Sequence, residues 1–540
     1  MTEPKPVAIV GGGPVGLSAA IVLARFGVRC RVFEQAPARS AHPKARGVRI
    51  RTMELFRQWG LEPELRARSL PPDALRFIYC DTLAGDELAR TDELEPRTFA
   101  AATTSSCRVA QDAVEQALVR RASAEASMEF NPETRVVALD QSADGVTVRT
   151  ADGDEYAAAY VIAADGVGST VRRALGIELA GERVVSWWRS VYWSGDLDRW
   201  AADRPCIQFV TGARTGRHVQ IASVDGRHRW VTLIASAPGE ERPADLGPDE
   251  ARAAIRGAIG DPLVEVDIHD IATFRISAQN ATSYRSGRVF LAGDAAHALP
   301  PTGGMGMNSG IQDVHNLAWK LAFVLNGWAD SRLLDSYDSE RRPVADNNIA
   351  WSRQNGKRFG ALRVALAEAD APRVAELLGE QRDHVSAVGQ DLGFAYAGGA
   401  IVPDGTPPPP ASPARYRPTA RPGHRAPAVW LDADRRRSTL DLYDTRFVLL
   451  VGHEARLGEL GAQPWLDTLR IGEPPLDHPE SDLHEAYGIS ATGAVLVRPD
   501  GHVAWRAERL PSDPAAGLGE VFARLGLGLG ASAAVPGGRR

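Results

Sequence analysis

A glycine-rich turn between a short apolar strand and a helix constrains the fold of this 540-residue chain more than any other feature. The apolar run Val7–Val10 predicts a strand, and the residues from the turn to Phe26 predict a helix. A second strand is expected over Cys30–Glu34. This order of elements predicts a parallel βαβ unit at the N-terminus.

The glycines of this turn have the GxGxxG spacing of a dinucleotide site. Gly11 permits the tight turn, Gly13 lets the backbone approach a pyrophosphate, and Gly16 allows the helix to pack closely on the strand. The helix N-terminus adds positive potential for phosphates, and Glu34 can accept hydrogen bonds from an adenosine ribose. The motif does not distinguish FAD from NAD. The predicted cofactor-binding residues of this unit are Gly11, Gly13, Pro14, Val15, Gly16, Glu34 and Gln35.

Length and charge limit the remaining possibilities. A chain of 540 residues is expected to form two to four compact units. The formal net charge of -6 gives no general attraction to nucleic acid, so no nucleic-acid partner is expected. No run of about 18 apolar residues is present, which argues against a membrane segment and favours a cytoplasmic protein.

The four cysteines are Cys30, Cys80, Cys107 and Cys206. No two of them have the close spacing of a zinc site or a redox dithiol. We expect reduced thiols and no metal site.

Two further motifs narrow the cofactor to FAD. The segment VIAADGVGSTVRRALG surrounds Asp165, and FLAGDAAHALPPTGGMGMNSG runs from Phe290 to Gly310. With the N-terminal turn, they make the chain resemble the FAD-dependent aromatic hydroxylases. This family of single-component flavoprotein monooxygenases includes phenol hydroxylases and hydroxylases of polyketide pathways.

The resemblance implies roles for these motifs. Asp294 would hydrogen-bond the ribitol of FAD, and the loop from Pro300 to Met307 would pass the reactive edge of the flavin. Asp165 would lie near the pyrophosphate, in a segment that also serves the nicotinamide cofactor. A helix starting near Asn308 would direct free N–H groups at the flavin pyrimidine. The predicted cofactor-binding residues here are Asp165, Gly166, Gly293, Asp294, Pro301, Gly304, Gly306, Met307 and Asn308.

The segment HPKARGVRIRTMELFRQWGL also resembles the family, in which a basic residue after the proline reaches the flavin. Many members have arginine there, whereas this chain has Lys44, with Arg46 two positions later. Lysine does not reproduce the planar fork of arginine, so both remain candidates. Gln111 stands where the family has a residue near the ribitol.

The chain is predicted to have an α/β fold: a Rossmann-like FAD-binding domain, an inserted β-sheet substrate domain and a C-terminal thioredoxin-like domain. The thioredoxin-like unit is implied by resemblance, and it contains no cysteine. Redox activity is therefore excluded for it, which leaves packing, dimer contact or shielding of the active site. The predicted boundaries are 1–182 and 279–402 for the FAD-binding domain, 183–278 for the substrate domain, 403–425 for a proline-rich linker and 426–530 for the C-terminal domain.

The resemblance implies a monooxygenase that uses FAD, NADPH or NADH, and O2 to hydroxylate a small aromatic substrate, a phenol or aromatic polyketide, through a C4a-hydroperoxyflavin. Aromatic residues of the insert are candidates to line the pocket: Trp187, Trp188, Tyr192, Trp193, Phe209 and Trp230. The sequence identifies no catalytic side chain. Baeyer–Villiger oxygenation of a ketone, or a flavin-binding protein without turnover, are the alternatives. A monomer or a homodimer is expected.

Overall fold

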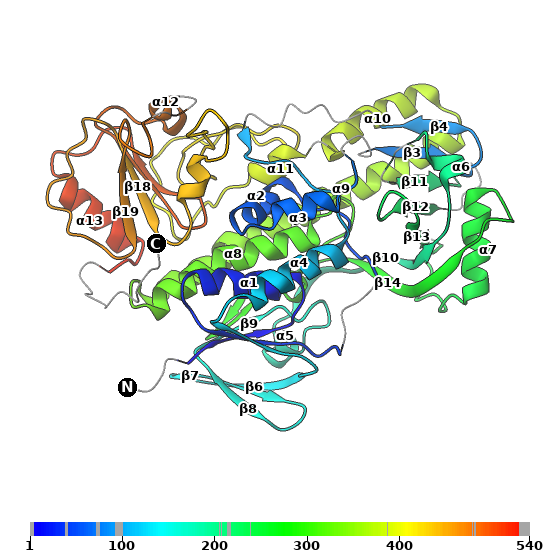
Figure 1. Ribbon diagram of the computed structural model, residues 1–540, viewed down its shortest axis with the longest axis horizontal. Helices are drawn as coiled ribbons and strands as arrows, with labels where there is room; N and C mark the ends of the chain where they lie inside the picture. Colours follow the sequence, from blue (N-terminus) through cyan, green and yellow to red (C-terminus); the bar gives the residue numbers. More distant parts are fainter. Residues whose placement is uncertain are drawn as a thin grey trace.

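In a computed structural model, the chain forms three bodies around separate sheets (Figure 1). The C-terminal unit lies at one end, the inserted sheet at the other, and the N-terminal βαβ unit between them. The α/β class predicted from the sequence is confirmed. The structure describes residues 5–37, 42–71, 76–91, 101–204, 206, 208–212, 218–237, 239–385, 387–477, 479 and 482–528.

The central sheet is parallel apart from one edge hairpin, because its strands are linked by helices. Its strands, in spatial order, are β15 (Arg285–Ser286), β16 (Val289–Leu291), β9 (Tyr160–Ala163), β1 (Val7–Val10), β2 (Cys30–Phe33) and β5 (Met128–Asn131). Helices α1 (Pro14–Arg25), α4 (Gln111–Ser123) and α8 (Gly306–Leu325) pack together beside it. A small sheet of β6 (Val136–Ser142), β7 (Gly145–Thr150) and β8 (Glu155–Ala158) is attached on the other side. The remaining short elements of this body are α2 (Ile50–Gln58), α3 (Glu62–Ala67), α5 (Thr170–Ala174) and the 3₁₀ turns η3 (Gly293–Ala295) and η4 (Ser331–Asp335).

The inserted sheet is built on two long antiparallel strands, β10 (Leu179–Ser194) and β14 (Asp267–Ala281). Its other strands are β17 (His297–Ala298), β13 (Arg229–Ala235), β12 (Val219–Ser223), β11 (Gln208–Thr211), β3 (Phe77–Cys80) and β4 (Glu87–Arg90). The last two come from the N-terminal part of the chain, and β3 pairs in parallel with β11. The domain boundaries given above stay predictions.

Two sets of helices cover the two faces of this sheet. Helix α7 (Pro248–Ile259) packs on one face, with Ala251, Ile255 and Ile259 in a core shared with the strands. Helices α9 (Ser336–Ala367) and α10 (Ala371–Val385) contact the opposite face near β3 and β11. That face looks toward the central body. The other helices of this region are α6 (Asp198–Ala201) and α11 (Val388–Leu392).

The C-terminal unit has a four-stranded sheet with one parallel and two antiparallel pairs, as expected for a thioredoxin-like domain. Its strands, in spatial order, are β19 (Leu466–Arg470), β18 (Phe447–Val451), β20 (Ala494–Val497) and β21 (Val503–Ala507). Its helical elements are η5 (Thr439–Leu442), α12 (Leu483–Tyr487) and α13 (Pro514–Arg524). Trp319 and Phe323 of α8 pack into the core of this unit, so the C-terminal domain is fixed to the long central helix.

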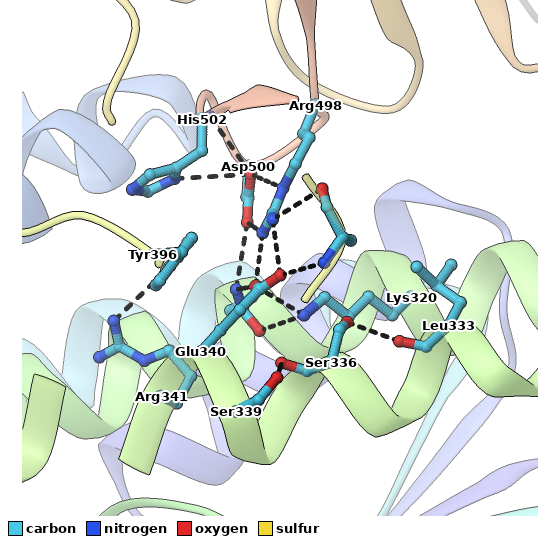
Figure 2. A network of polar contacts seen from close by, with 12 residues as sticks. Lys320, Leu333, Ser336, Ser339, Glu340, Arg341, Tyr396, Arg498, Asp500 and His502 are labelled. Carbon is cyan, nitrogen blue, oxygen red and sulfur yellow. Dashed lines mark hydrogen bonds and ion pairs between the residues drawn. The ribbon is translucent and has the colours of Figure 1, made fainter. Parts of the chain in front are cut away.

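A buried network of charges also joins the C-terminal unit to the central body (Figure 2). Glu340 of α9 accepts hydrogen bonds from Lys320 of α8 at 2.8 Å and from Arg498, which follows β20, at 2.8 and 2.9 Å. Arg498 also pairs with Asp500, and all four side chains are sealed from solvent. Burial alone would raise the pKa of Glu340, but Arg498 and Lys320 lower it to about 2. Burial lowers the pKa of Lys320 to about 8, which is still above neutral pH, so every member of this network is ionised and paired at neutral pH.

Candidate functional site

The N-terminal turn has the close backbone approaches that its glycines predict. Gly11 has a φ of 107°, in the region that favours glycine, and a Cβ there would overlap the carbonyl of Ala164. A Cβ at Gly16 would overlap the carbonyl of Gly11. In contrast, a Cβ at Gly13 would meet no protein atom within 4 Å, so the middle glycine borders open space at the start of α1.

Glu34 lies after β2, where the sequence places it, and it braces the turn. Its Oε2 accepts from the Gly12 N–H at 2.7 Å, and its Oε1 accepts from the Ala36 N–H at 2.8 Å. A carboxylate oxygen accepts two hydrogen bonds, so each retains capacity for a ribose hydroxyl. Gln35 is exposed beside it.

Asp165 has one committed and one open carboxylate oxygen. Its Oδ2 accepts from the backbone N–H groups of Thr170 and Val171, at 2.8 and 3.2 Å, and so satisfies the start of α5. Its Oδ1 is buried without a hydrogen-bond partner. Gly166, with a φ of 78°, borders open space. A buried acceptor beside open space fits a ligand that brings a donor.

Gly293 and Asp294 converge with the N-terminal turn. A Cβ at Gly293 would lie 2.9 Å from Val15, and a Cβ at Gly310 would lie 2.6 Å from the same side chain. The Gly293 N–H donates to Asp313 of α8 at 3.1 Å. Asp294 is exposed on one side, and desolvation by the protein on the others raises its pKa, whereas the charge of Lys44 acts in the opposite direction.

Helix α8 begins at Gly306, two residues before the predicted start. The Ser309 N–H bonds the carbonyl of Met305, so the N–H groups of Gly306, Met307 and Asn308 precede the helical bonding pattern. The Asn308 side chain is committed to the protein. It accepts from the Arg49 N–H and donates to the carbonyls of residues 304 and 47.

The loop before α8 is held from the side of α9. Thr302 Oγ1 donates to the Ser352 carbonyl at 2.6 Å. Gly303 approaches the ring of Trp351 so closely that a Cβ would overlap it. Pro301 is exposed, and a Cβ at Gly304 would meet no protein atom within 4 Å.

The segment from His42 to Val48 is tied down by Gln111. The Gln111 N–H donates to the Ala45 carbonyl at 2.8 Å, and Gln111 Oε1 accepts from the Ala45 N–H at 3.2 Å. Its side chain therefore orients the segment that carries the two basic residues. Lys44 is exposed and Arg46 is half-buried.

A second positive charge, to which the sequence motifs assign no role, lies next to Arg46. Arg108 approaches Gly47, and its Nε is buried without a hydrogen-bond partner. Burial lowers the pKa of both Arg46 and Arg108 to about 10. Arg49 beside them is neutralised by Asp391 at 2.8 Å. Two arginines without a carboxylate partner among the described residues suit an anionic ligand.

One face of the inserted sheet combines aromatic and polar groups that are only half-buried. Trp188 and Phe274 are cross-strand partners on β10 and β14, and the ring of His218 meets Trp188 edge-on at 5.0 Å. Gln220 of β12 hydrogen-bonds His218 at 2.9 Å. Burial, reinforced by the charge of Arg363, lowers the pKa of His218 to about 4, so this ring is neutral at neutral pH.

Other aromatic residues predicted to line a pocket have a different place. Trp193, Phe209 and Trp230 pack in the core between the sheet and α7. Tyr192 is buried near Ala110. Because successive strand residues point to opposite faces, only part of the aromatic set faces the central body.

These features test whether the chain fits FAD. Four features lie along segments that meet around α1 and α8. They are the open backbone at Gly13, the unsatisfied Asp165, the free helix start at Gly306 and the pair Arg46 and Arg108. The carboxylates can accept hydrogen bonds from ligand hydroxyls, and the arginines and free backbone N–H groups can donate to anionic parts of a ligand. The residues present therefore fit a flavin dinucleotide.

Comparison with known proteins decides the family. Residues 5–352 match the model of the FAD binding domain, and residues 419–526 match the model of the aromatic-ring hydroxylase C-terminal domain. A putative polyketide hydroxylase from Streptomyces halstedii is 36% identical over 93% of each chain. This chain belongs to the FAD-dependent aromatic hydroxylases.

Two more relatives define the range of this hydroxylase family. The 2,4-dichlorophenol 6-monooxygenase of Cupriavidus pinatubonensis is 32% identical over 97% of each chain. The flavin-dependent monooxygenase PieE, solved with FAD and substrate, has a TM-score of 0.88 at 32% identity, covering 97% of this chain and 99% of its own. The hydroxylase is thus an FAD-dependent monooxygenase, as predicted, and NADPH or NADH is the typical reductant of the family.

Three further observations concern the cysteines, potential metal ligands or membrane spans, and His297. The four cysteines are free and buried. Within the described ranges, no group of three potential metal ligands occurs, and no helix is long and apolar enough to cross a membrane. His297 is fully buried against Asp313 at 2.7 Å, below the Gly293 turn, as a packed side chain would be.

Proposed function

We propose that this hydroxylase adds one oxygen atom to a phenolic or aromatic polyketide substrate bound between the inserted sheet and the cofactor body. The observation that carries the proposal is the half-buried face of Trp188, Phe274, His218 and Gln220. Flat aromatic side chains suit a flat ring, and neutral polar groups suit its oxygen substituents. The names of the relatives, a polyketide hydroxylase and a chlorophenol monooxygenase, support both substrate types.

The cofactor contacts proposed here follow the motifs. The start of α1, with Gly11, Gly13, Pro14, Val15 and Gly16, would hold the pyrophosphate of FAD. Asp165 and Gly166 would lie near it, with Asp165 Oδ1 accepting from a hydroxyl of the cofactor. Glu34 and Gln35 would face the adenosine ribose. Asp294, after Gly293, would bind the ribitol. The α8 start, with Pro301, Gly304, Gly306, Met307 and Asn308, would face the flavin pyrimidine.

The basic segment has a divided role in this proposal. Arg46 and Arg108 supply positive charge near the flavin, and Lys44 lies close enough to Asp294 to act on its pKa. Gln111 orients the segment through Ala45. FAD, when bound, would supply the redox chemistry, which is hydride acceptance from reduced nicotinamide and transfer of one oxygen atom of O2.

The protein's own work is to position the ring and to exclude water. The half-buried sheet face and the loop fixed by Thr302 and Asn308 contribute to both tasks. Reduced, buried thiols support a cytoplasmic location. A monomer or a homodimer remains the predicted assembly.

The test uses purified holoenzyme, with its flavin spectrum recorded first. Oxidation of NADPH and of NADH is followed with oxygen uptake against phenols and polycyclic aromatic ketones, and products are weighed by mass spectrometry. One oxygen gained on an aromatic ring is the expected result. A lactone would indicate Baeyer–Villiger oxygenation instead, and a protein without flavin would refute the proposal.

A matched pair of variants locates the substrate. Trp188→Ala should weaken substrate binding, raising KM about tenfold, because an aromatic contact of about 1.4 kcal/mol is lost. Trp187→Ala is the control, since Trp187 pairs with Arg275 on the other face of the same strand. Equal effects of both changes would contradict the proposed position of the substrate.

A further inference from the structure

A serine, a histidine and an aspartate form a continuous hydrogen-bonded chain where the basic segment meets the inserted sheet. His42 Nε2 lies 2.8 Å from Ser190 Oγ of β10, and His42 Nδ1 lies 2.9 Å from Asp270 Oδ2 of β14. In sequence, His42 is 148 positions from Ser190 and 228 positions from Asp270. His42 begins the basic segment, whereas Ser190 and Asp270 lie outside the cofactor motifs.

The donors and acceptors along this chain are fixed by chemistry. A carboxylate only accepts, so His42 Nδ1 carries the proton that it donates to Asp270. Burial lowers the pKa of His42, which Asp270 opposes and Lys44 and Arg46 reinforce, so the ring is neutral at neutral pH. Nε2 is then an acceptor, and Ser190 donates its hydroxyl proton to it.

The charged and titratable groups around His42 come from every neighbouring element. Lys44 and Arg46 lie on its own segment, and Asp270 on β14. Tyr192 of β10 packs its ring edge-on against His42 at 6.1 Å. Asp270 is the carboxylate that His42 Nδ1 contacts, and it sets the direction in which a proton leaves.

Exposure changes along the chain in one direction. Ser190 and the His42 side chain are 5% and 6% exposed, whereas the Asp270 side chain is 49% exposed. Ser190 faces the same side of β10 as Trp188, whose cross-strand partner is Phe274, next on that face after Ala272. The Ser190 end of this hydrogen-bonded chain therefore adjoins the proposed substrate face, and the Asp270 end reaches solvent.

The same residue types make hydrolytic triads, but the surroundings here differ. Ser190 lies in the middle of β10 and pairs with Leu233 on one side and Ala272 on the other. Its backbone N–H belongs to the sheet and does not form an oxyanion hole with a neighbouring turn. The arrangement suits proton transfer and not nucleophilic attack.

We propose that Ser190, His42 and Asp270 form a proton path that ionises a phenolic substrate before oxygen transfer. This inference rests on the proposed function. The substrate O–H proton passes to Ser190 Oγ as the serine proton passes to His42 Nε2, and the His42 Nδ1 proton passes to Asp270 and then to water. One proton leaves, no electrons move, and the ring is left as the more electron-rich phenolate. His42 acts through Ser190 and is a positioning residue.

The test is the pH profile of kcat for a phenol that the wild-type holoenzyme hydroxylates. His42→Gln should lower kcat about a hundredfold at pH values below the pKa of that phenol, as general-base effects do. Above that pKa the phenol ionises in water, so the variant should recover to within about threefold. KM should change little across the range.

Controls separate this role from a structural one. His269→Gln alters a neighbouring histidine that contacts Ser194 and the Tyr192 ring, outside the path, and should keep the wild-type profile. Asp270→Asn is the second variant, at a half-exposed position that does not endanger folding, and should shift the profile in the same direction as His42→Gln. Flavin content is measured for each.

Any of the following outcomes overturns the inference. A His42→Gln profile parallel to wild type, or a uniform loss at every pH, contradicts the proton path alone. A wild-type profile for Asp270→Asn contradicts its exit to solvent. Failure of the wild type to hydroxylate any phenol refutes the proposed phenolic substrate first, and the inference with it.

Discussion

Replacing Arg498 with methionine tests whether the buried network fixes the C-terminal unit to the cofactor body. Arg498 makes five hydrogen bonds: two to Glu340, two to Asp500 and one to the Ala400 carbonyl. Methionine fills similar space without charge. Lys320 would then be the only cation of the four-residue set, facing two buried carboxylates.

The expected cost follows from that imbalance. Removing one partner of a buried ionic set typically costs about 3–5 kcal/mol, because a charge is left without compensation away from water. Whole domains are stable by only about 5–15 kcal/mol, so Arg498→Met should be close to the limit of folding. Arg498→Lys keeps the charge but not the two-pronged geometry, and should cost less.

Urea denaturation at pH 7.5, followed by circular dichroism, measures these differences. Arg332→Met is the matched control, because Arg332 is 80% exposed and pairs with Asp330 at the surface. Exposed pairs contribute about 0–1 kcal/mol. If Arg498→Met falls within about 1 kcal/mol of Arg332→Met, the network does not stabilise the domain contact as argued.

Two further changes separate cofactor contact from folding. Gly13→Ala should leave the stability of the flavin-free protein unchanged yet weaken FAD binding. Gly16→Ala should destabilise the flavin-free protein by about 1–3 kcal/mol, because its Cβ would overlap the preceding turn. Thermal melts with and without FAD distinguish the two variants, and identical melts would contradict this expectation. His424 is buried, and burial together with the charge of Arg421 lowers its pKa to about 4. The stability contributed by neutral His424 is complete above its unfolded pKa near 6.5 and is lost as pH falls toward 4, about 3 kcal/mol in all. His424→Gln should therefore reduce the fall of the urea midpoint between pH 7.5 and pH 5, whereas His453→Gln, at an exposed position, should not. If the midpoints of wild type and His424→Gln fall equally over this range, the assignment is refuted.

The parts of the fold that the sequence predicted are those decided by near neighbours. The strand, turn and helix around Gly11 and Gly16 are determined within about thirty residues, and the structure places β1 at the predicted residues. The early start of α8 at Gly306 differs because Met305 packs inside a core and its carbonyl accepts the first helical bond. Local pattern gave no sign of that packing.

The parts that escaped prediction depend on contacts between distant segments. The pairing of β3 with β11 joins residues 77–79 to residues 208–210, which no periodicity indicates. His42 meets Asp270 only because two long strands bring β14 beside the basic segment. Gln111 was predicted beside the ribitol, and its bonds to Ala45 depend on the same tertiary arrangement. Its contact with FAD stays a prediction.

The four charges at the seam of the C-terminal unit are divided evenly between the two sides. Lys320 and Glu340 belong to the cofactor body, and Arg498 and Asp500 to the C-terminal unit, so each side is neutral by itself. When this unit is exchanged between relatives, Arg498 and Asp500 therefore need to be present or absent together. A donor domain that brings both residues, or neither, keeps the seam neutral, whereas one that brings a single residue introduces a lone charge where the side chains are sealed from solvent. Chimeras that fold, and natural substitutions at this seam, should keep each side of it electrically neutral.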